Sequence, residues 1–192
     1  NKIYSSETNN PFIFPVVNIC TVSTGEIIGL SSSAKALSEG QFGSFPVYAF
    51  TTDGVWALSV SGTGGFSAKQ PMSYDVCINP SSITQLDNSV LFATDRGIML
   101  IQGSQTQCIT DTIFNVDEIV ISDLPHIYLL IDVYNKSATF DEYIGKDPIK
   151  IKPFVDYIKN CSIIYDYVHQ RIIVTNRIYP YSYVFSFLTK RW

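Results

Sequence analysis

Apolar and polar residues alternate in two stretches that repeat nearly the same phrase. The first, FTTDGVWALSV, covers residues 50–60, and the second, FATDRGIMLIQG, begins 42 positions later (92 minus 50). In each stretch, apolar or β-branched residues flank a short polar centre, which is typical of two antiparallel strands joined by a tight turn. We therefore predict hairpins over residues 47–60 and 90–102.

The two polar centres differ in their turn residues. Asp53 and Gly54 form an Asp-Gly pair, which favours a two-residue type I′ turn because both central residues need positive φ. In the second copy Arg96 separates Asp95 from Gly97, which favours a three-residue loop with a type I turn and a left-handed glycine bulge. The sequence therefore predicts structural turns at Asp53–Gly54 and Asp95–Gly97, with different loop lengths.

The spacing of the two copies predicts the fold class. Repeats of about 40–45 residues are typical of four-stranded propeller blades. Between the copies, GTGG reads as a turn, and FSAKQP and YDVCIN read as short strands. We expect a mainly β chain of antiparallel hairpins or blades, propeller-like in part, with two or three short helices.

The N-terminal part divides into an arm and a repeat region. Two prolines and an Asn pair in residues 1–15 indicate an extended arm. Residues 16–22 and the stretch IIGL at 27–30 are apolar enough to form strands. Serines that can cap a helix, followed by helix formers and Gly40, predict one or two helical turns over residues 31–40. We assign residues 16–111 to the repeat region.

Residues 112–192 form a mixed segment, expected to belong to the same domain. Residues 124–134 read equally as a helix or as a buried strand, because periodicity does not separate short apolar runs. The stretch PFVDYIKN at 153–160 predicts a short helix with apolar residues at 154, 155 and 158 on one side. The stretches SIIYDYVHQRIIVTN and YSYVFSFLTKRW predict two further hairpins.

The four cysteines do not have metal-ligand spacing. They are Cys20, Cys77, Cys108 and Cys161, each more than 30 positions from the next. Zinc sites usually draw ligand pairs from short Cys-x-x-Cys turns, because closing several long loops around one ion costs entropy. We therefore expect four buried thiols in a reducing compartment, and neither a metal nor a cofactor.

The remaining candidates for chemistry favour structural roles. His126 and His169 have no second His or Glu at helical spacing, so they do not form a zinc-binding helix. The glycines of GTGG are followed by FSAKQP, whose proline argues against the helix that a phosphate-binding loop needs. A stretch rich in aromatic residues, YPYSYVF at 179–185, reads as strand packing, with a stacking platform for sugars or bases as the alternative. Four aspartates in or near turns lack the spacing of a calcium loop; they are Asp53, Asp87, Asp95 and Asp111. We expect no catalytic residue.

Composition and charge narrow the classes of function. The chain has 192 residues, of which 46% are hydrophobic and 16% charged, a composition typical of a folded protein. No transmembrane run or signal peptide is visible, and both ends read as cuts through a longer chain. Residues 1–135 hold 4 Lys and Arg against 12 Asp and Glu, and residues 136–192 hold 9 against 5. The net charges of the two regions, −8 and +4, indicate either a polar assembly surface or two ordinary solvated faces. The sequence has no dense cluster of Lys and Arg, so we expect no specific nucleic-acid binding.

Four phrases together resemble a family of structural proteins. They are LSEGQFGSFPVYAFTTDGVWAL, SSITQLDNSVLFATDRGIMLIQG, SIIYDYVHQRIIVTN and YSYVFSFLTKRW. They resemble the β-propeller-like packaged-DNA stabilisation or tail-nozzle proteins of tailed phages and prophages of gut bacteria, over most of residues 11–192. The resemblance implies a multi-copy virion component, assembled in the bacterial cytoplasm, that helps to close the DNA exit channel. The chain is short for such a protein.

Two functions are favoured, and an enzyme remains a third option. The first is a non-enzymatic structural and assembly component of a phage or prophage tail, with copies of itself or other tail proteins as partners and with no membrane partner. The second is a carbohydrate- or protein-binding β-module of the host bacterium. An assembly module should expose strand edges or apolar patches that a neighbour covers, whereas a binding module should show a concave aromatic pocket.

Overall fold

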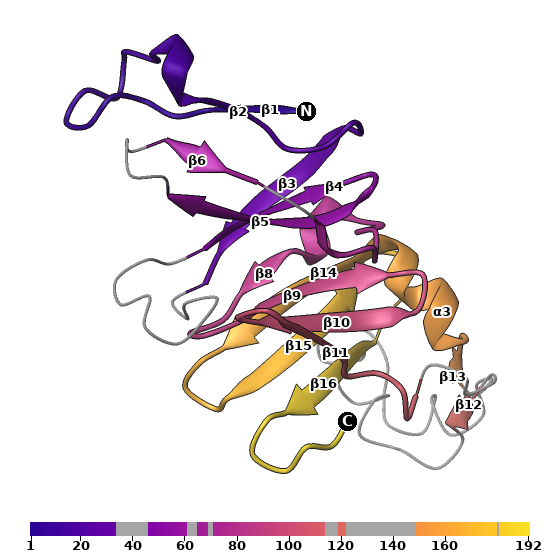
Figure 1. Ribbon diagram of the computed structural model, residues 1–192. Coiled ribbons are helices and arrows are strands. Elements are labelled where there is room, and N and C mark those ends of the chain that lie inside the picture. Colours follow the sequence, from indigo (N-terminus) through magenta and orange to yellow (C-terminus); the bar gives the residue numbers. More distant parts are fainter. Residues whose placement is uncertain (34–45, 61–64, 69–70, 114–118, 122–148, 180) are drawn as a thin grey trace, which may run out of the picture.

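The computed structural model describes residues 1–33, 46–60, 65–68, 71–113, 119–121, 149–179 and 181–192, with only the backbone for 119–121 and 149–151 (Figure 1). Most of the helix expected at residues 31–40, most of GTGG and all of the segment 124–134 lie outside these residues. His126 also lies outside them. The described part is mainly β, and every strand pair in it is antiparallel.

Three larger sheets follow one another along the chain. Sheet 1 contains β3 (Ile27–Ser32), β4 (Val47–Thr51), β5 (Gly54–Val60), β6 (Phe66–Ser67) and β7 (Pro71–Ser73). Sheet 2 is a meander of β8 (Thr84–Gln85), β9 (Val90–Thr94), β10 (Gly97–Gln102) and β11 (Gln105–Cys108). Sheet 3 contains β14 (Cys161–Asp166), β15 (Arg171–Asn176) and β16 (Ser182–Ser186).

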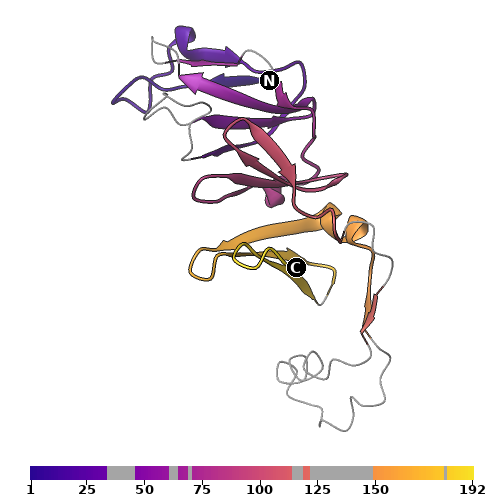
Figure 2. The ribbon, with the colours of Figure 1, turned by 60° about the horizontal axis from the view of Figure 1, so that its bottom comes forward.

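Smaller elements complete the described fold. β1 (Lys2–Tyr4) pairs with β2 (Ile19–Thr21), and β12 (Ile119–Ile121) pairs with β13 (Ile149–Ile151). The helices are η1 (Val16–Asn18), η2 (Pro80–Ser82), α3 (Phe154–Tyr157) and η3 (Ile158–Asn160). Figure 2 shows the layers in chain order, with the β1–β2 pair next to sheet 1 and then sheets 2 and 3.

The central strands of sheet 2, β9 and β10, are buried on both faces. All five residues of β9 are buried, and successive side chains along a strand point to opposite faces. Val90 and Phe92 pack into the core shared with sheet 1, whereas Leu91 and Ala93 pack into the core shared with sheet 3. The continuous apolar run VLFA thus follows from this position, because a strand covered on both sides has no face for polar residues.

The core between sheets 1 and 2 centres on an aromatic pair. Phe50 of β4 and Phe92 of β9 are both fully buried, and their ring centroids lie 5.0 Å apart in a tilted arrangement. The other buried members of this cluster are Tyr48, Val55, Cys77, Val90, Met99 and Ile101. Tyr48 donates its hydroxyl to the carbonyl of Gly103 at 2.9 Å, so its buried polar atom is satisfied.

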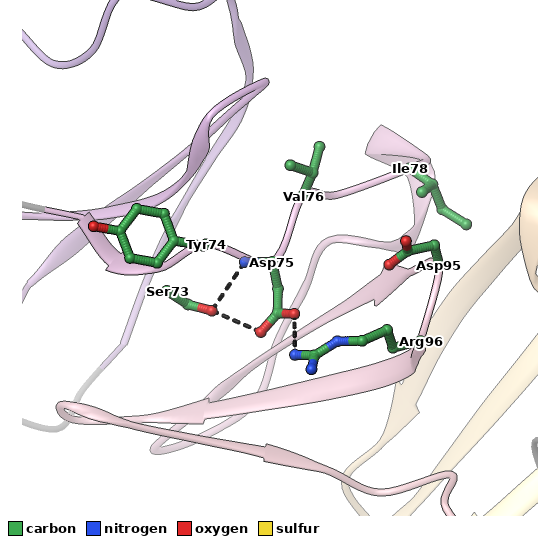
Figure 3. A pocket seen from close by; sticks show the side chains of 7 residues that line it. All are labelled: Ser73, Tyr74, Asp75, Val76, Ile78, Asp95 and Arg96. Carbon is green, nitrogen blue, oxygen red and sulfur yellow. Dashed lines mark hydrogen bonds and ion pairs between the residues drawn. The ribbon is translucent and has the colours of Figure 1, made fainter.

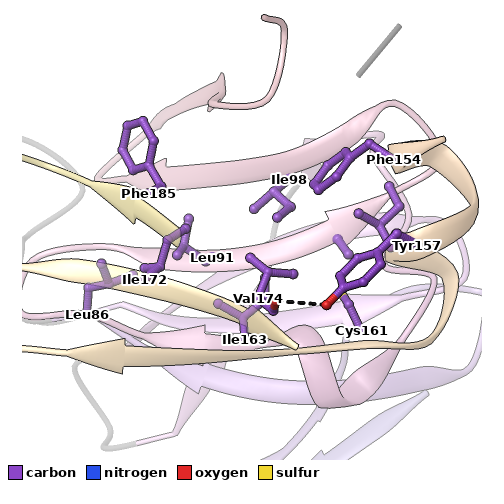
Figure 4. Packing of buried hydrophobic residues seen from close by; sticks show 12 residues of the cluster. Leu86, Leu91, Ile98, Phe154, Tyr157, Cys161, Ile163, Ile172, Val174 and Phe185 are labelled. Atoms are coloured by element: carbon purple, nitrogen blue, oxygen red, sulfur yellow. Dashed lines mark hydrogen bonds between the residues drawn. The ribbon is translucent and has the colours of Figure 1, made fainter. Parts of the chain in front are cut away.

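The core between sheets 2 and 3 is the largest (Figure 4). Leu91 and Ile98 of sheet 2 face the apolar side chains of sheet 3, which are Ile163, Ile172, Val174 and Phe185. The helical segment 154–160 closes one end of this core with Phe154, Tyr157 and Ile158. Sheets 2 and 3 therefore share one core, although a long segment separates them in the sequence.

Tyr157 anchors the aromatic residues of the C-terminal region. Its ring stacks on Tyr181 at 5.2 Å and meets Tyr183 edge-on at 4.9 Å. Its hydroxyl donates to the carbonyls of Val174 and Tyr181, at 3.1 and 2.7 Å, and burial raises its pKa. The aromatic residues of YPYSYVF that the structure describes thus pack against the core, as strand packing predicts.

The structure confirms several of the expected elements. Both expected hairpins are present as β4–β5 and β9–β10, and SIIYDYVHQRIIVTN forms the hairpin β14–β15. The expected helix at 153–160 is present as α3 and η3, but its third buried residue is Tyr157 rather than Val155.

Other expectations were wrong. YDVCIN forms no strand, and residues 16–18 form a 3-10 turn before a shorter strand. The arm at 1–15 contains the strand β1, which pairs with β2, and turns follow at residues 8–9 and 11–12. YSYVFSFLTKRW adds one strand to β15, and only the isolated bridge between Ser186 and Arg191 follows. The sheets of the described residues are open, and the propeller stays a prediction.

Replacing Phe92 with Ala should lower the free energy of unfolding of the protein. The change removes a fully buried ring from the core between sheets 1 and 2, and such truncations cost about 3–5 kcal/mol. The measurement is the free energy of unfolding in a urea titration. Phe12→Ala, at an exposed phenylalanine, should change it by less than about 0.5 kcal/mol, and equal effects of the two variants would contradict the assigned core.

Candidate functional site

The two hairpin turns have the same geometry. In the first copy the turn lies one residue before the expected centre. Thr51 pairs with Gly54, and Thr94 pairs with Gly97. The turns proper are therefore Thr52–Asp53 and Asp95–Arg96. Each glycine is the first residue of the following strand, so the shared pattern is Thr-x-x-Gly.

The threonine side chain closes each turn in the same way. Thr51 Oγ1 accepts from the amide of Asp53 at 3.2 Å and donates to the carbonyl of Gly54 at 2.9 Å. Thr94 Oγ1 accepts from the amide of Arg96 at 3.2 Å and donates to the carbonyl of Gly97 at 2.9 Å. Both threonines are fully buried, so these bonds satisfy hydroxyls that would otherwise be costly to bury.

The expectation of a type I′ turn at Asp53–Gly54 was wrong. Type I′ needs positive φ at both central residues, but neither Thr52 nor Asp53 has positive φ. Gly54 and Gly97 instead follow their turns with φ of 129° and 128°. The loops have equal lengths, and the structural repeat is 43 residues (97 minus 54) rather than the 42 that the two phenylalanines indicated.

Each turn also binds the linker that precedes its sheet. Before sheet 1, Ser23 Oγ accepts from the amide of Gly25 at 3.1 Å, and Gly25 N and Thr24 Oγ1 donate to Asp53 Oδ2 at 2.7 and 2.8 Å. These bonds lower the pKa of Asp53. We call such a contact between a linker and a turn a lock.

The second lock has the opposite polarity. Ser73 Oγ accepts from the amide of Asp75 at 3.1 Å, which repeats the Ser23 arrangement. Here the linker supplies the carboxylate of Asp75, and the turn supplies the guanidinium of Arg96, which pairs with it. Asp75 raises the pKa of Arg96, which thus stays charged. In the first lock the turn supplies the anion, and in the second lock the linker does.

A shallow depression of about 650 Å³ lies beside the second lock (Figure 3). Its lining residues are Ser73, Tyr74, Asp75, Val76, Ile78, Asp95 and Arg96. The side chain of Tyr74 is 80% exposed. An exposed ring beside Asp and Arg side chains can stack on a sugar and bond its hydroxyls, so this depression is a candidate small-ligand site.

The thiols and the described histidine do not form a nucleophilic site. Burial raises the pKa of Cys77 and that of Cys161, the latter to about 12, which leaves the thiols protonated and weakly nucleophilic. His169 Nδ1 lies 2.8 Å from Asp166 in the β14–β15 turn. The four cysteines form no disulfide, and the described residues contain no group of three His, Cys, Asp or Glu that could hold a metal.

The turn aspartates do not come together. Asp53 belongs to the first lock, and Asp87 accepts from the hydroxyl of Tyr165 at 3.3 Å. Asp95 lines the depression, and Asp111 lies beside Cys108, whose pKa it helps to raise. Sequence reasoning missed Arg96 and Asp75 as a pair, although the 43-residue spacing of the two Thr-x-x-Gly patterns aligns Arg96 with Asp53.

Two apolar surfaces are exposed at the ends of the stack. The first is the finger, which we define as residues 11–17, where Phe12, Val16 and Val17 are 89%, 81% and 86% exposed. The second is the outer face of sheet 3, which we define as the row Ile164, Ile173 and Val184. These three residues pair in register across β14, β15 and β16, and Ile164 is 53% exposed.

Comparison with known proteins identifies no family for the chain. No protein-family model matches it, and no curated protein matches it either. No helix among the described residues is long and apolar enough to span a membrane.

Gly54→Ala should destabilise the protein more than Gly97→Ala. Both glycines have φ near 130°, where a side chain costs about 1–3 kcal/mol. A Cβ at Gly54 would in addition lie 2.3 Å from the carbonyl oxygen of Ser73. Thermal unfolding of both variants measures the difference, and a Gly54→Ala protein as stable as the wild type would contradict the turn geometry.

Proposed function

We propose that this chain is a non-enzymatic structural module that assembles with copies of itself or with other subunits of a phage or prophage tail. The observation that carries the proposal is sheet 3. Its inner face packs on sheet 2, and its outer face presents the apolar row Ile164, Ile173 and Val184. An exposed row of paired apolar residues on a sheet face is typical of a contact surface, so a neighbour should cover this row.

The stacked sheets support a propeller-type module. Each sheet packs face to face on the next one in chain order, and sheets 1 and 2 repeat the same turn and the same kind of lock. Repeating sheets that bury faces against their neighbours are the principle of propeller blades. The tail assignment itself is supported by the resemblance of the four phrases, which implies a virion component assembled in the bacterial cytoplasm.

The wild-type chain should self-associate. Its two exposed apolar surfaces would be costly to leave in water, so its mass in light scattering should rise with concentration above that of a 192-residue monomer. Phe12→Ala, which leaves the core intact, should lower the mass at a given concentration. A strictly monomeric chain at every concentration, or a tight and specific sugar ligand in a glycan array, would count against this function.

The second candidate function is a carbohydrate-binding module, favoured by the depression at Tyr74. The exposed ring and the Asp75–Arg96 pair have the chemistry of a sugar subsite. Against this function, the depression contributes one aromatic ring and is shallow, whereas the apolar surfaces are the features expected of an assembly module.

Tyr74→Ala separates the two functions. If the depression binds a sugar, the variant should lose at least about tenfold in affinity for any glycan that the wild type binds, because an anchoring ring at a binding surface is worth more than 1 kcal/mol. If the protein is an assembly module, the wild type should bind no glycan and Tyr74→Ala should leave its mass in light scattering unchanged. Tyr74→Phe, which retains the ring, is the matched control.

A further inference from the structure

The finger is an ordered apolar projection. Its backbone is held by bonds from Glu7 N to Ile13 O at 2.8 Å and from Asn18 N to Pro15 O at 2.9 Å. A side-chain bond from Phe12 N to Asn10 Oδ1 at 3.2 Å adds to them. The conformation is therefore fixed while its side chains are exposed, so binding through them would lose little backbone entropy.

The outer face of sheet 3 is the matching feature at the other end of the molecule. Its central row crosses three strands at paired positions, where β-branched residues make an apolar strip. Polar pairs border the strip: Ser162 pairs with Thr175 on one side, and Asp166 pairs with Arg171 on the other. An apolar centre with a polar rim is the usual composition of a protein interface.

The two surfaces lie at opposite ends of the stack of sheets, with the β1–β2 pair at one end and sheet 3 at the other (Figures 1 and 2). The finger projects from the β1–β2 pair, whereas the second surface is the face of a sheet. Two fingers from two copies would leave sheet 3 uncovered, whereas one contact between a finger and an outer face covers both surfaces at once. A contact between unlike surfaces is heterologous, and it either closes into a ring or continues as a filament.

The charges favour the same pairing. Residues 149–192, which include sheet 3, hold 7 Lys and Arg against 2 Asp and Glu. Residues 1–33, which include the finger, hold 1 Lys against 2 Glu, so the surroundings of the finger are weakly acidic. An acidic part of one copy would thus approach the basic part of the next, which steers orientation more than it adds affinity.

We propose that the finger of one copy docks on the outer face of sheet 3 of a second copy. Phe12, Val16 and Val17 are the anchors on one side, and Ile164, Ile173 and Val184 accept them on the other. The contact is directional, so each copy uses its finger toward one neighbour and its sheet toward another. This inference rests on the proposed assembly function and names the surfaces that carry it.

Two variants test the contact. The finger variant carries Phe12→Ser, Val16→Ser and Val17→Ser, and the face variant carries Ile164→Thr and Val184→Thr. All five positions are exposed, so circular dichroism and the melting temperature should match those of the wild type. Tyr74→Ser is the matched control, because it removes an exposed ring that belongs to neither surface.

Sedimentation velocity across a concentration series should distinguish the surfaces. Each variant alone should stay monomeric, with self-association weakened at least about tenfold, and the control should behave as the wild type. Mixed in equal amounts, the two variants should form a dimer and nothing larger, because the intact finger of the face variant meets the intact outer face of the finger variant. A variant with all five changes should form no dimer with itself.

Different outcomes would overturn the docking contact and the assembly function. Wild-type association that neither variant weakens, or a mixture no heavier than its components, would overturn this contact and leave the assembly function standing. A wild-type chain that is monomeric throughout would overturn both. If the outer face is covered within the same chain, the face variant should melt at a lower temperature while the wild type stays monomeric, which would also overturn the contact.

Discussion

The burial of sheet 2 on both faces is the constraint on which the described fold depends. Strand β9 alternates its side chains between two cores, with Phe92 on Phe50 of sheet 1 and Leu91 facing sheet 3. Among the described residues, sheets 1 and 3 share no buried cluster with each other, so sheet 2 connects them. The order of sheets in space therefore equals their order in the chain, and sheet 3 becomes an end layer whose outer face presents one apolar row between polar residues.

The sequence predicted the strand pairs well and their details less well. Alternation around Thr51 and Thr94 located both hairpins, because apolar residues on either side of a polar pair have few other arrangements. The turn type was wrong because Asp-Gly is only a local preference, and here the buried threonine hydroxyl determines which residues turn. YDVCIN reads as a strand by composition, yet it becomes a linker whose Cys77 fills the core between sheets 1 and 2.

The features most relevant to function depend on long-range contacts and could not be read locally. The Asp75–Arg96 pair joins residues 21 positions apart, and neither residue has a local pattern that marks it. The outer face of sheet 3 is similar: the apolar pairs in SIIYDYVHQRIIVTN are visible in the sequence, but which isoleucines face outward depends on where sheet 2 packs. The finger was not predicted either, because the sequence indicated an extended arm over residues 1–15 and a strand over 16–22, whereas residues 16–18 form a 3-10 turn.

The opposite polarity of the two locks has a consequence for folding fidelity. A chain built from similar sheets risks a kinetic trap in which the linker of one unit pairs with the turn of another. If the turn of sheet 1 met the linker of sheet 2, Asp53 would face Asp75, and the two neighbouring carboxylates would repel each other. If the turn of sheet 2 met the linker of sheet 1, Arg96 would face the donors of Thr24 and Gly25 with no anion between them. Charge therefore favours the pairing of each linker with its own turn over the exchanged pairing.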